Sequence, residues 1–250
     1  MAPQIRIIGI EGIPEAHAGD NIADLIATGL EQSGLEIETG DVLVVTHKLV
    51  SKAEGRLVAL ETVAPSPFAQ WIARRFDKDP RQVEVVLRES ARIVRMDRGI
   101  IIAETRHGFV CANAGVDASN VPPGHVSLLP EDPDASAARI RSDLIRRFGR
   151  EHAVIITDSF GRPWRNGIVN VAIGAAGMQP LLDYRGQADT FGNELRITIM
   201  AVADELAAAA ELVMGKVDRC PAAIVRGYRY QPGAGRAADL IMPAERDLFR

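Results

Sequence analysis

The sequence predicts an α+β fold in which mixed sheets pack against helices, and three observations favour this class. Apolar runs with the length of buried strands occur near residues 5–10, 42–45, 100–103, 109–112, 154–157 and 168–173. Amphipathic segments with helical spacing lie between some of these runs, but the alternation is too irregular for a doubly wound parallel sheet. A hydrophobic content of 47% over 250 residues is sufficient for one large core or two closely packed ones.

The predicted elements of the first half follow from local signals. The first strand leads into a turn at 11–14, and Asp20 is expected to cap the helix that follows it. Ser66 and Asp79 each precede a proline, a pattern typical of a helix N-terminus. The second of these helices is expected to carry apolar residues as far as Ile93. The next two apolar runs are separated by the short connection 105–108, which predicts a hairpin.

The second half begins with a proline-rich loop at 121–133. Asp134 is expected to cap a basic amphipathic helix that ends at Gly149. Its arginines favour a solvated charged face over an anion-binding patch, and they are Arg139, Arg141, Arg146, Arg147 and Arg150.

A strand at 154–157 is followed by a donor-rich loop at 161–167 and further sheet. A long helix is expected from Asn193 to Gly215, and a strand at 223–225 follows the turn after it. We treat residues 1–250 as a single unit, in which 228–250 form a C-terminal tail whose last part, from Asp239, is expected to be loosely ordered.

Composition excludes several classes of function. The net charge is −4 and no basic stripe is present, so nucleic acid is not an expected partner. No apolar stretch approaches the roughly 20 residues that cross a bilayer, and the N-terminus lacks a signal layout, so we expect a cytoplasmic protein without a membrane partner. The histidines lack zinc-site spacing, and Cys111 lies in an apolar run where a thiol usually has a structural role.

Two apolar runs end on an acidic residue among small polar neighbours. These residues are Asp117 and Asp158, the second followed by Ser159. Asp often caps turns, and a purely structural turn cap would explain either residue taken alone. Two such strand ends in one chain favour a shared site of hard oxygen ligands for Mg²⁺ or Mn²⁺, because sheet-based folds collect ligands at the carboxyl ends of strands.

Cations flank the same strand ends, as a site for nucleotide phosphates requires. They are Lys48, Lys52, Arg162 and Arg165, and we assign the two arginines to a phosphate or carboxylate of a substrate. Neither a P-loop nor a G-x-G-x-x-G fingerprint is present, so a nucleotide site would be assembled differently. The residues alone predict a metal-assisted phosphate or nucleotide enzyme. They leave open another phosphotransferase or phosphohydrolase, and a non-catalytic nucleotide-binding module.

Several of these segments, taken together, resemble the coenzyme F420-0:L-glutamate ligase family, also called F420 γ-glutamyl ligase. The matching segments run in order from residue 11 to about 227 and are 11–14, 40–45, 50–56, 113–120, 155–158 with 161–162, and 214–215. The resemblance implies a GTP-dependent ligase that activates the carboxylate of F420-0 as an acyl phosphate and joins it to L-glutamate. Further γ-linked glutamates are also implied.

The resemblance also implies site residues, cofactors and an assembly. It puts Asp117 and Asp158 on a divalent metal, Mg²⁺ or Mn²⁺, with Ser159 near a second one, and it implies stimulation by K⁺. It implies an unusual fold, neither Rossmann nor P-loop, with two intertwined subdomains in a homodimer. Some relatives have hydroxyl residues in place of His47 and Lys48 and Thr in place of Ser159, and the turn after Gly215 is less glycine-rich here than in some of them. The residues that the resemblance places around GTP are Glu11, Gly12, Ile13, Pro14, His47, Lys48, Lys52, Asn120, Met214, Gly215, Lys216, Val217, Asp218, Arg219, Cys220 and Pro221.

Overall fold

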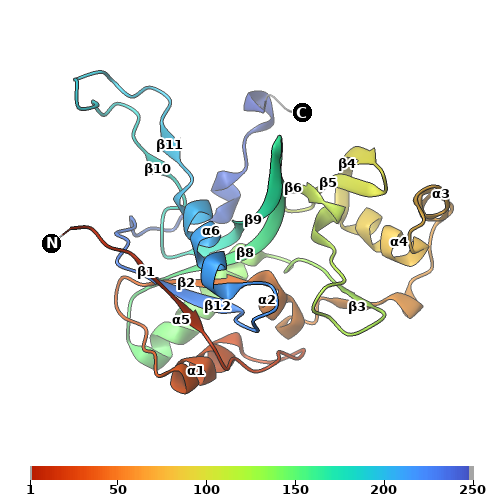
Figure 1. Cartoon of the computed structure of the whole chain (residues 1–250), viewed down its shortest axis with the longest axis horizontal. Helices are drawn as coiled ribbons and strands as arrows, with labels where there is room; N and C mark the ends of the chain where they lie inside the picture. Colours follow the sequence, from red (N-terminus) through yellow and green to blue (C-terminus); the bar gives the residue numbers. More distant parts are fainter. Residues whose placement is uncertain (1, 248–250) are drawn as a thin grey trace.

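A five-stranded sheet forms the centre of the computed structural model, which describes residues 2–247 (Figure 1). The strands lie in the order β1 (Arg6–Ile10), β12 (Ala222–Arg226), β2 (Val42–Thr46), β8 (Ala153–Arg162) and β9 (Arg165–Ala176). β2 and β8 are parallel, and the other neighbours are antiparallel. The mixed sheet with packed helices confirms the predicted α+β class.

Helices cover both faces of this sheet. α1 (Ile22–Ser33) and α5 (Pro133–Phe148) share one apolar core with Val154 and Ile156 of β8. α6 (Val202–Met214) shares a second core with Ala153 and Ile155 of the same strand. Side chains on a strand alternate between the two faces, so β8 is apolar on both sides and buried between the layers.

A third core lies beside the sheet, in the yellow part of Figure 1. It packs α3 (Pro67–Phe76) and α4 (Pro80–Glu89) against a sheet of β4 (Ser90–Asp97), β5 (Ile100–Thr105) and β6 (Val110–Ala112). The short strands β3 (Leu57–Ala59) and β7 (His125–Ser127) pair between this core and the centre, and β3 follows α2 (His47–Ala53). The predicted hairpin at 105–108 is confirmed.

A long hairpin with the strands β10 (Leu182–Asp183) and β11 (Ile199–Met200) extends away from the molecule (Figure 1). The helix predicted from Asn193 is therefore wrong in its first turns, because residues 193–200 belong to this hairpin and α6 begins at Val202. The apolar residues that suggested helix there are not part of a core, since Ile199 is 38% exposed and Leu195 is only partly buried.

Two of the predicted helix caps are correct and two are wrong. Ser66 and Asp79 cap α3 and α4 as expected. Asp20 accepts instead from the backbone N–H of His17, and the cap of α1 is Asn21. The cap of α5 is Asp132, which accepts from the Ala135 N–H at 3.0 Å, so Asp134 lies inside the helix.

The carboxylate of Asp134 takes part in protecting the open edge of the central sheet. It accepts the Ala175 N–H of β9 at 2.8 Å, and Asp204 of α6 accepts the Ala172 N–H at 2.8 Å. β9 pairs only with β8, so these N–H groups have no strand partner. Two carboxylates thus satisfy backbone donors on the outer side of β9.

Other expected boundaries also moved. β8 continues past Thr157 to Arg162, so Asp158 lies within a strand, and the donor-rich loop is a tight turn to β9. Ile93 belongs to β4, because α4 ends at Glu89. The proline-rich loop contains β7. The rest of the described chain contains 3₁₀ turns at Leu60–Thr62, Asn113–Gly115, Ala237–Leu240 and Ala244–Arg246.

The last two of these turns lie in the tail expected to be loosely ordered, where Leu240 packs on the second core. The end of that tail, 248–250, lies outside the described residues. Among residues 2–247, no helix has the length and apolar character needed to cross a membrane.

Candidate functional site

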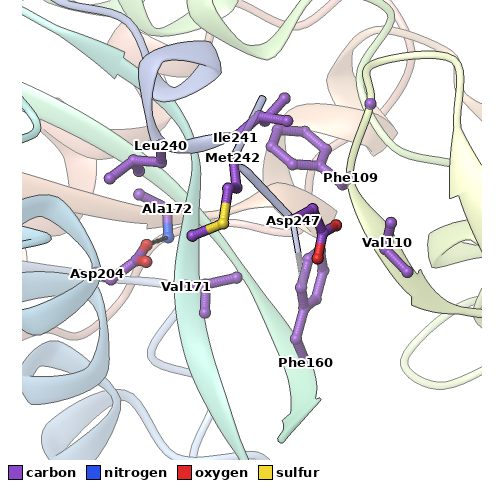
Figure 2. A pocket seen from close by; sticks show the side chains of 11 residues that line it. Phe109, Val110, Phe160, Val171, Ala172, Asp204, Leu240, Ile241, Met242 and Asp247 are labelled. Atoms are coloured by element: carbon purple, nitrogen blue, oxygen red, sulfur yellow. Dashed lines mark hydrogen bonds between the residues drawn. The ribbon is translucent and has the colours of Figure 1, made fainter. Parts of the chain in front are cut away.

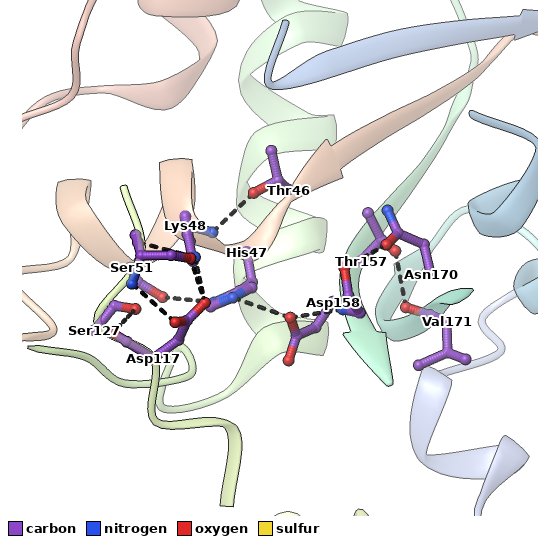
Figure 3. A network of polar contacts seen from close by, with 12 residues as sticks. Thr46, His47, Lys48, Ser51, Asp117, Ser127, Thr157, Asp158, Asn170 and Val171 are labelled. Carbon is purple, nitrogen blue, oxygen red and sulfur yellow. Dashed lines mark hydrogen bonds and ion pairs between the residues drawn. The ribbon is translucent and has the colours of Figure 1, made fainter. Parts of the chain in front are cut away.

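The parallel pairing of β2 with β8 brings two polar side chains together at one end of the central sheet. Thr46, the last residue of β2, pairs with Thr157 of β8. The residues that follow them in the chain, His47 and Asp158, therefore lie side by side. Nε2 of His47 is 3.2 Å from Oδ1 of Asp158 (Figure 3). α2 begins directly at His47, because the Thr46 hydroxyl accepts the Lys48 N–H at 3.1 Å and caps the helix.

His47 is almost completely buried and is held from both ring nitrogens. Its side chain is 3% exposed, and Nδ1 lies 3.4 Å from the Ser51 hydroxyl one turn along α2. Burial alone would raise the pKa of Asp158. The charge and hydrogen bond of His47, together with the hydrogen bond from the Ser159 N–H, have a larger effect in the opposite direction, so the pKa lies below its ordinary value. Asp158 is therefore an ionised carboxylate in a largely buried position.

A run of left-handed residues leads the chain to Asp117. Asn113, Ala114 and Gly115 have φ of 52°, 51° and 73°. A Cβ on Gly115 would lie 2.7 Å from Cγ of Leu129, so glycine is required at that point. The backbone of Asp117 then exchanges hydrogen bonds with Ser127 at 3.1 and 2.8 Å, which fixes the position of its carboxylate.

Lys48 binds the carboxylate of Asp117. Its ammonium lies 2.5 Å from Oδ2 of Asp117 and 2.9 Å from the Ser119 carbonyl. Burial alone would raise the pKa of Asp117. The hydrogen bonds from Lys48 and Ser119 have a larger effect in the opposite direction, so this pKa too lies below its ordinary value. The Lys48 charge also lowers the pKa of Asp158, and Figure 3 shows the two aspartates on either side of His47. The two aspartates thus belong to two neighbouring polar clusters, one with Lys48 and one with His47, and their binding of a shared ion stays a prediction.

A second polar group lies on the opposite face of β8. The Lys216 ammonium, in the turn after α6, donates to the Ser159 hydroxyl and lies 3.2 Å from Oε1 of Glu211. The Ser159 hydroxyl donates to Oδ1 of Asn170 at 2.6 Å, and Nδ2 of Asn170 donates to Oε2 of Glu211 at 2.7 Å. Sequence reasoning missed Asn170 and Glu211, because their placement depends on the register of β8 with β9 and on the direction of α6.

The segments that the resemblance placed around GTP meet at the same end of the sheet. Ile10 pairs with Ala222, so the turn at 11–14 lies beside the turn at 214–221. The Pro221 carbonyl accepts the Thr46 N–H at 2.9 Å, and Asn120 donates to the Lys216 carbonyl at 3.4 Å. Lys52 pairs with Glu15. These contacts hold three segments that are far apart in the sequence, at 11–15, 120 and 214–221, around the start of α2.

The two arginines assigned to a substrate lie elsewhere. Arg162 and Arg165 face each other across the turn between β8 and β9, and Arg162 donates to the Asn166 carbonyl at 2.7 Å. Among the described residues, no hydrogen bond or ion pair joins either arginine to Lys48, Asp117 or Asp158. In the 214–221 turn, Val217 is 86% exposed.

The donor set at Asp117 and Asp158 fits a hard divalent cation. Carboxylate oxygens with adjacent hydroxyls are what Mg²⁺ and Mn²⁺ prefer. The contacts of Asp158 with His47 and with the Ser159 N–H both use Oδ1, and within residues 2–247 its Oδ2 accepts no hydrogen bond. The same part of the chain contains no group of three or more His, Cys, Asp or Glu residues able to hold a metal by themselves. A bound cation would therefore need further oxygens, such as those of phosphate or water.

An apolar pocket of about 240 Å³ lies between β6, the β8–β9 hairpin and the C-terminal segment (Figure 2), and neither Asp117 nor Asp158 is among its lining residues. Phe109 and Phe160 meet edge to face in it, with ring centroids 6.3 Å apart. Asp204 also lines the pocket, and burial raises the pKa of its carboxyl group. Phe160 lies two residues beyond Asp158 on β8, so both side chains project from the same face of the strand.

Comparison with known proteins gives a consistent result. A family model described as F420-0:Gamma-glutamyl ligase matches residues 11–227. A coenzyme F420:L-glutamate ligase of Methanothermobacter thermautotrophicus is 50% identical over 249 residues, which cover 98% of this chain and 99% of that protein. Proteins with the same name from Methanopyrus kandleri and Methanocaldococcus jannaschii are 50% and 43% identical, each over 99% of this chain and 98% and 97% of their own lengths.

Proposed function

The chain belongs to the F420-0:γ-glutamyl ligase family, and from this membership we propose that it joins L-glutamate to the carboxylate of F420-0 at the expense of GTP. It is a ligase of coenzyme F420 biosynthesis. The nucleotide, the reaction path and the extension to a γ-linked poly-glutamate tail are parts of the proposal. So are the need for Mg²⁺ or Mn²⁺ and the stimulation by K⁺.

The proposed reaction has two steps. A carboxylate oxygen of F420-0 attacks the γ-phosphorus of GTP, and the bond to GDP breaks, which gives an acyl phosphate and GDP. The amine of L-glutamate then attacks the acyl carbon, inorganic phosphate leaves, and the amine loses a proton. Positioning and charge stabilisation are the main demands of such a transfer, so no nucleophilic side chain is required.

The observation that carries this proposal is the network of Lys48, His47 and the two aspartates at the end of the sheet. A divalent cation held by Asp117 and Asp158 would neutralise charge that builds on the phosphate oxygens. The Lys48 ammonium supplies a second positive charge beside Asp117. His47 holds the carboxylate of Asp158 in one orientation, in the way that a hydrogen-bonded neighbour orients a ligand at a metal site.

The direct test is incubation with F420-0, GTP, Mn²⁺ and L-glutamate, followed by product mass and by GDP and phosphate release. We expect nucleotide turnover that requires both F420-0 and glutamate, and a product heavier by a glutamyl group. Turnover that ignores glutamate would favour the phosphotransferase or phosphohydrolase alternative. Nucleotide binding without any turnover would favour the non-catalytic module.

The first prediction concerns the two aspartates. Asp117→Asn and Asp158→Asn keep the size of the side chain but remove its charge, so each should lower kcat by about 100-fold or more. Ligation rates at saturating Mn²⁺ measure the loss, and circular dichroism checks the fold. The control is Asp97→Asn, at an exposed position of β4. Full activity in either site variant would remove the metal assignment.

We assign the apolar pocket to the ring system of the acceptor. A flat aromatic molecule fits a pocket lined by aromatic and aliphatic side chains, and the pocket opens beside the strand that carries Asp158. Phe160→Ala should raise the KM for F420-0 by about 10-fold, since it removes aromatic contacts, while the KM for GTP changes little. Initial rates with each substrate varied in turn measure the two effects, and equal changes in both constants would contradict the assignment.

We also propose a homodimer. The support is the projecting β10–β11 hairpin, whose Phe191 and Ile197 are 90% and 89% exposed. Exposed apolar side chains on a projecting segment are typical of contacts between protein chains.

A further inference from the structure

Four side chains on the face of β8 opposite Asp158 form a closed ring of polar contacts. Lys216 donates to the Ser159 hydroxyl, Ser159 donates to Asn170, Asn170 donates to Glu211, and Glu211 pairs with Lys216. Three of these groups come from different elements, β8, β9 and α6, and Lys216 lies in the turn after α6. Glu211 uses both carboxylate oxygens and the Ser159 proton is given to Asn170, so the ring needs no metal ion, while contacts among the described residues leave the Lys216 ammonium one N–H for a further acceptor.

The ring bears on the second metal ion that the resemblance places near Ser159. A serine hydroxyl has one proton and two lone pairs. Its proton is given to Asn170, and its oxygen already accepts from the Lys216 ammonium. A divalent cation on that oxygen would lie next to the Lys216 ammonium, which repels it. The carboxylate within reach, Glu211, is already neutralised by the same ammonium.

The site at Asp117 and Asp158 differs in this respect. It offers two carboxylates against one lysine, and Oδ2 of Asp158 accepts no hydrogen bond within residues 2–247. A cation can therefore bind there beside Lys48 with net attraction. At Ser159 the lysine and the glutamate balance each other, and the remaining groups are neutral.

We infer that the Lys216 ammonium is a tethered cation that takes the place of a second metal ion at Ser159. This inference rests on the proposed nucleotide-dependent ligase function. The backbone of Lys216 is tied to the loop after Asp117, because Asn120 donates to its carbonyl at 3.4 Å. The ammonium therefore lies on the side of β8 opposite Asp158 but near the segments assigned to the nucleotide, where it pairs with a phosphate oxygen. The chain uses one divalent ion per active site.

The experiment counts metal ions. Equilibrium dialysis with Mn²⁺ and a non-hydrolysable GTP analogue gives the number of Mn²⁺ ions bound per bound nucleotide. We expect one Mn²⁺ for the wild-type chain and two for Lys216→Met, because removal of the ammonium frees Ser159 and Glu211 as oxygen ligands. Lys216→Arg, which keeps the charge, should bind one. The matched control is Lys78→Met, which removes a lysine from the exposed α3–α4 connection and should also leave one.

Kinetics provide a second readout. Ligation by Lys216→Met should be at least 10-fold slower than wild type at low Mn²⁺ and should recover at high Mn²⁺, with a steeper dependence on the metal concentration. A purely structural role of Lys216 would lower the rate equally at all metal concentrations and would overturn the inference. The double variant Lys216→Met with Ser159→Ala should return to one Mn²⁺, since the hydroxyl ligand is lost.

The inference and the proposed function fail in different ways. Two Mn²⁺ ions in the wild-type chain, together with glutamate-dependent product, would overturn the role of Lys216 and leave the function in place. One Mn²⁺ in both the wild type and Lys216→Met would also overturn that role. One Mn²⁺ in the wild type and two in Lys216→Met, with no ligated product from any variant, would support the tethered cation and overturn the proposed ligation.

Discussion

At the scale of single residues, the charged groups of the candidate site lie on the two opposite faces of one strand, β8. Asp158 projects toward His47 on one face of β8, and its neighbour Ser159 contacts Lys216 on the other. Because side chains alternate along a strand, these two consecutive residues meet different partners. In the proposed site, the metal ion and Lys216 would therefore lie on opposite faces of β8.

Cys111 shows how strongly the same region is closed to water. Burial, with the charge of Asp158, raises the pKa of its thiol from 9.0 to about 12. The thiolate fraction at pH 8 is thus lower by about a thousandfold than in the unfolded chain. We predict that iodoacetamide modifies Cys111 very slowly in the native protein and rapidly in urea, as measured by peptide mass. Rapid native modification would contradict this.

The same shift has a consequence for stability. Between pH 9.0 and about 12 the folded thiol keeps a proton that the unfolded thiol releases, so the contribution of Cys111 is complete below this window and falls as the pH rises through it. Cys111→Ser should flatten this alkaline decline relative to the wild type.

At the scale of elements, the end of β12 is fixed to the turn before β2 by a buried ion pair. Arg226 donates to both oxygens of Asp41 at 2.9 and 2.8 Å, and Asp41 is 2% exposed. Arg226→Met would leave this carboxylate buried without its partner and should lower the free energy of unfolding by about 3–5 kcal/mol. Urea denaturation measures the loss. Arg6→Met is the control, because Arg6 pairs with Arg226 across the sheet but is exposed, and a similar loss there would contradict the prediction.

Structural features that depend only on residues nearby in the chain could be predicted from the sequence. Ser66 and Asp79 cap helices because a cap needs only the next three residues. Asp134 was wrongly predicted as a cap, because its carboxylate binds backbone groups of Ala175 and Ala237, far along the chain. The helix predicted from Asn193 failed because apolar spacing does not distinguish a buried helix from an exposed hairpin.

The candidate site was predictable to the same degree. Asp117 and Asp158 were identified from the ends of apolar runs, and the structure places each of them against a residue at the start of α2, Lys48 for Asp117 and His47 for Asp158. Asn170 and Glu211 could not be identified, because nothing in their own segments shows which strand register or helix direction they will meet. Arg162 and Arg165 were assigned from proximity in sequence, but the hairpin turn carries them away from the network.

At the scale of the whole molecule, the projecting hairpin provides the surface for the proposed homodimer. Phe191→Ser combined with Ile197→Ser should shift the protein toward single-chain mass, since it removes most of the apolar contact area that this segment exposes. Light scattering at micromolar concentration measures the mass. Phe68→Ser, a half-exposed aromatic on α3, is the control. A wild-type chain that is itself monomeric would contradict the dimer.

The carboxylates of Asp204 and Asp134 on the outer side of β9 have a consequence for how copies of this chain can associate. A free sheet edge invites open-ended stacking of strands from neighbouring molecules, the route to fibrils. Here two of the hydrogen-bond donors that an incoming strand would need at β9, the N–H groups of Ala172 and Ala175, are already engaged. Strand addition at β9 is thereby less favourable than at an edge whose donors are free.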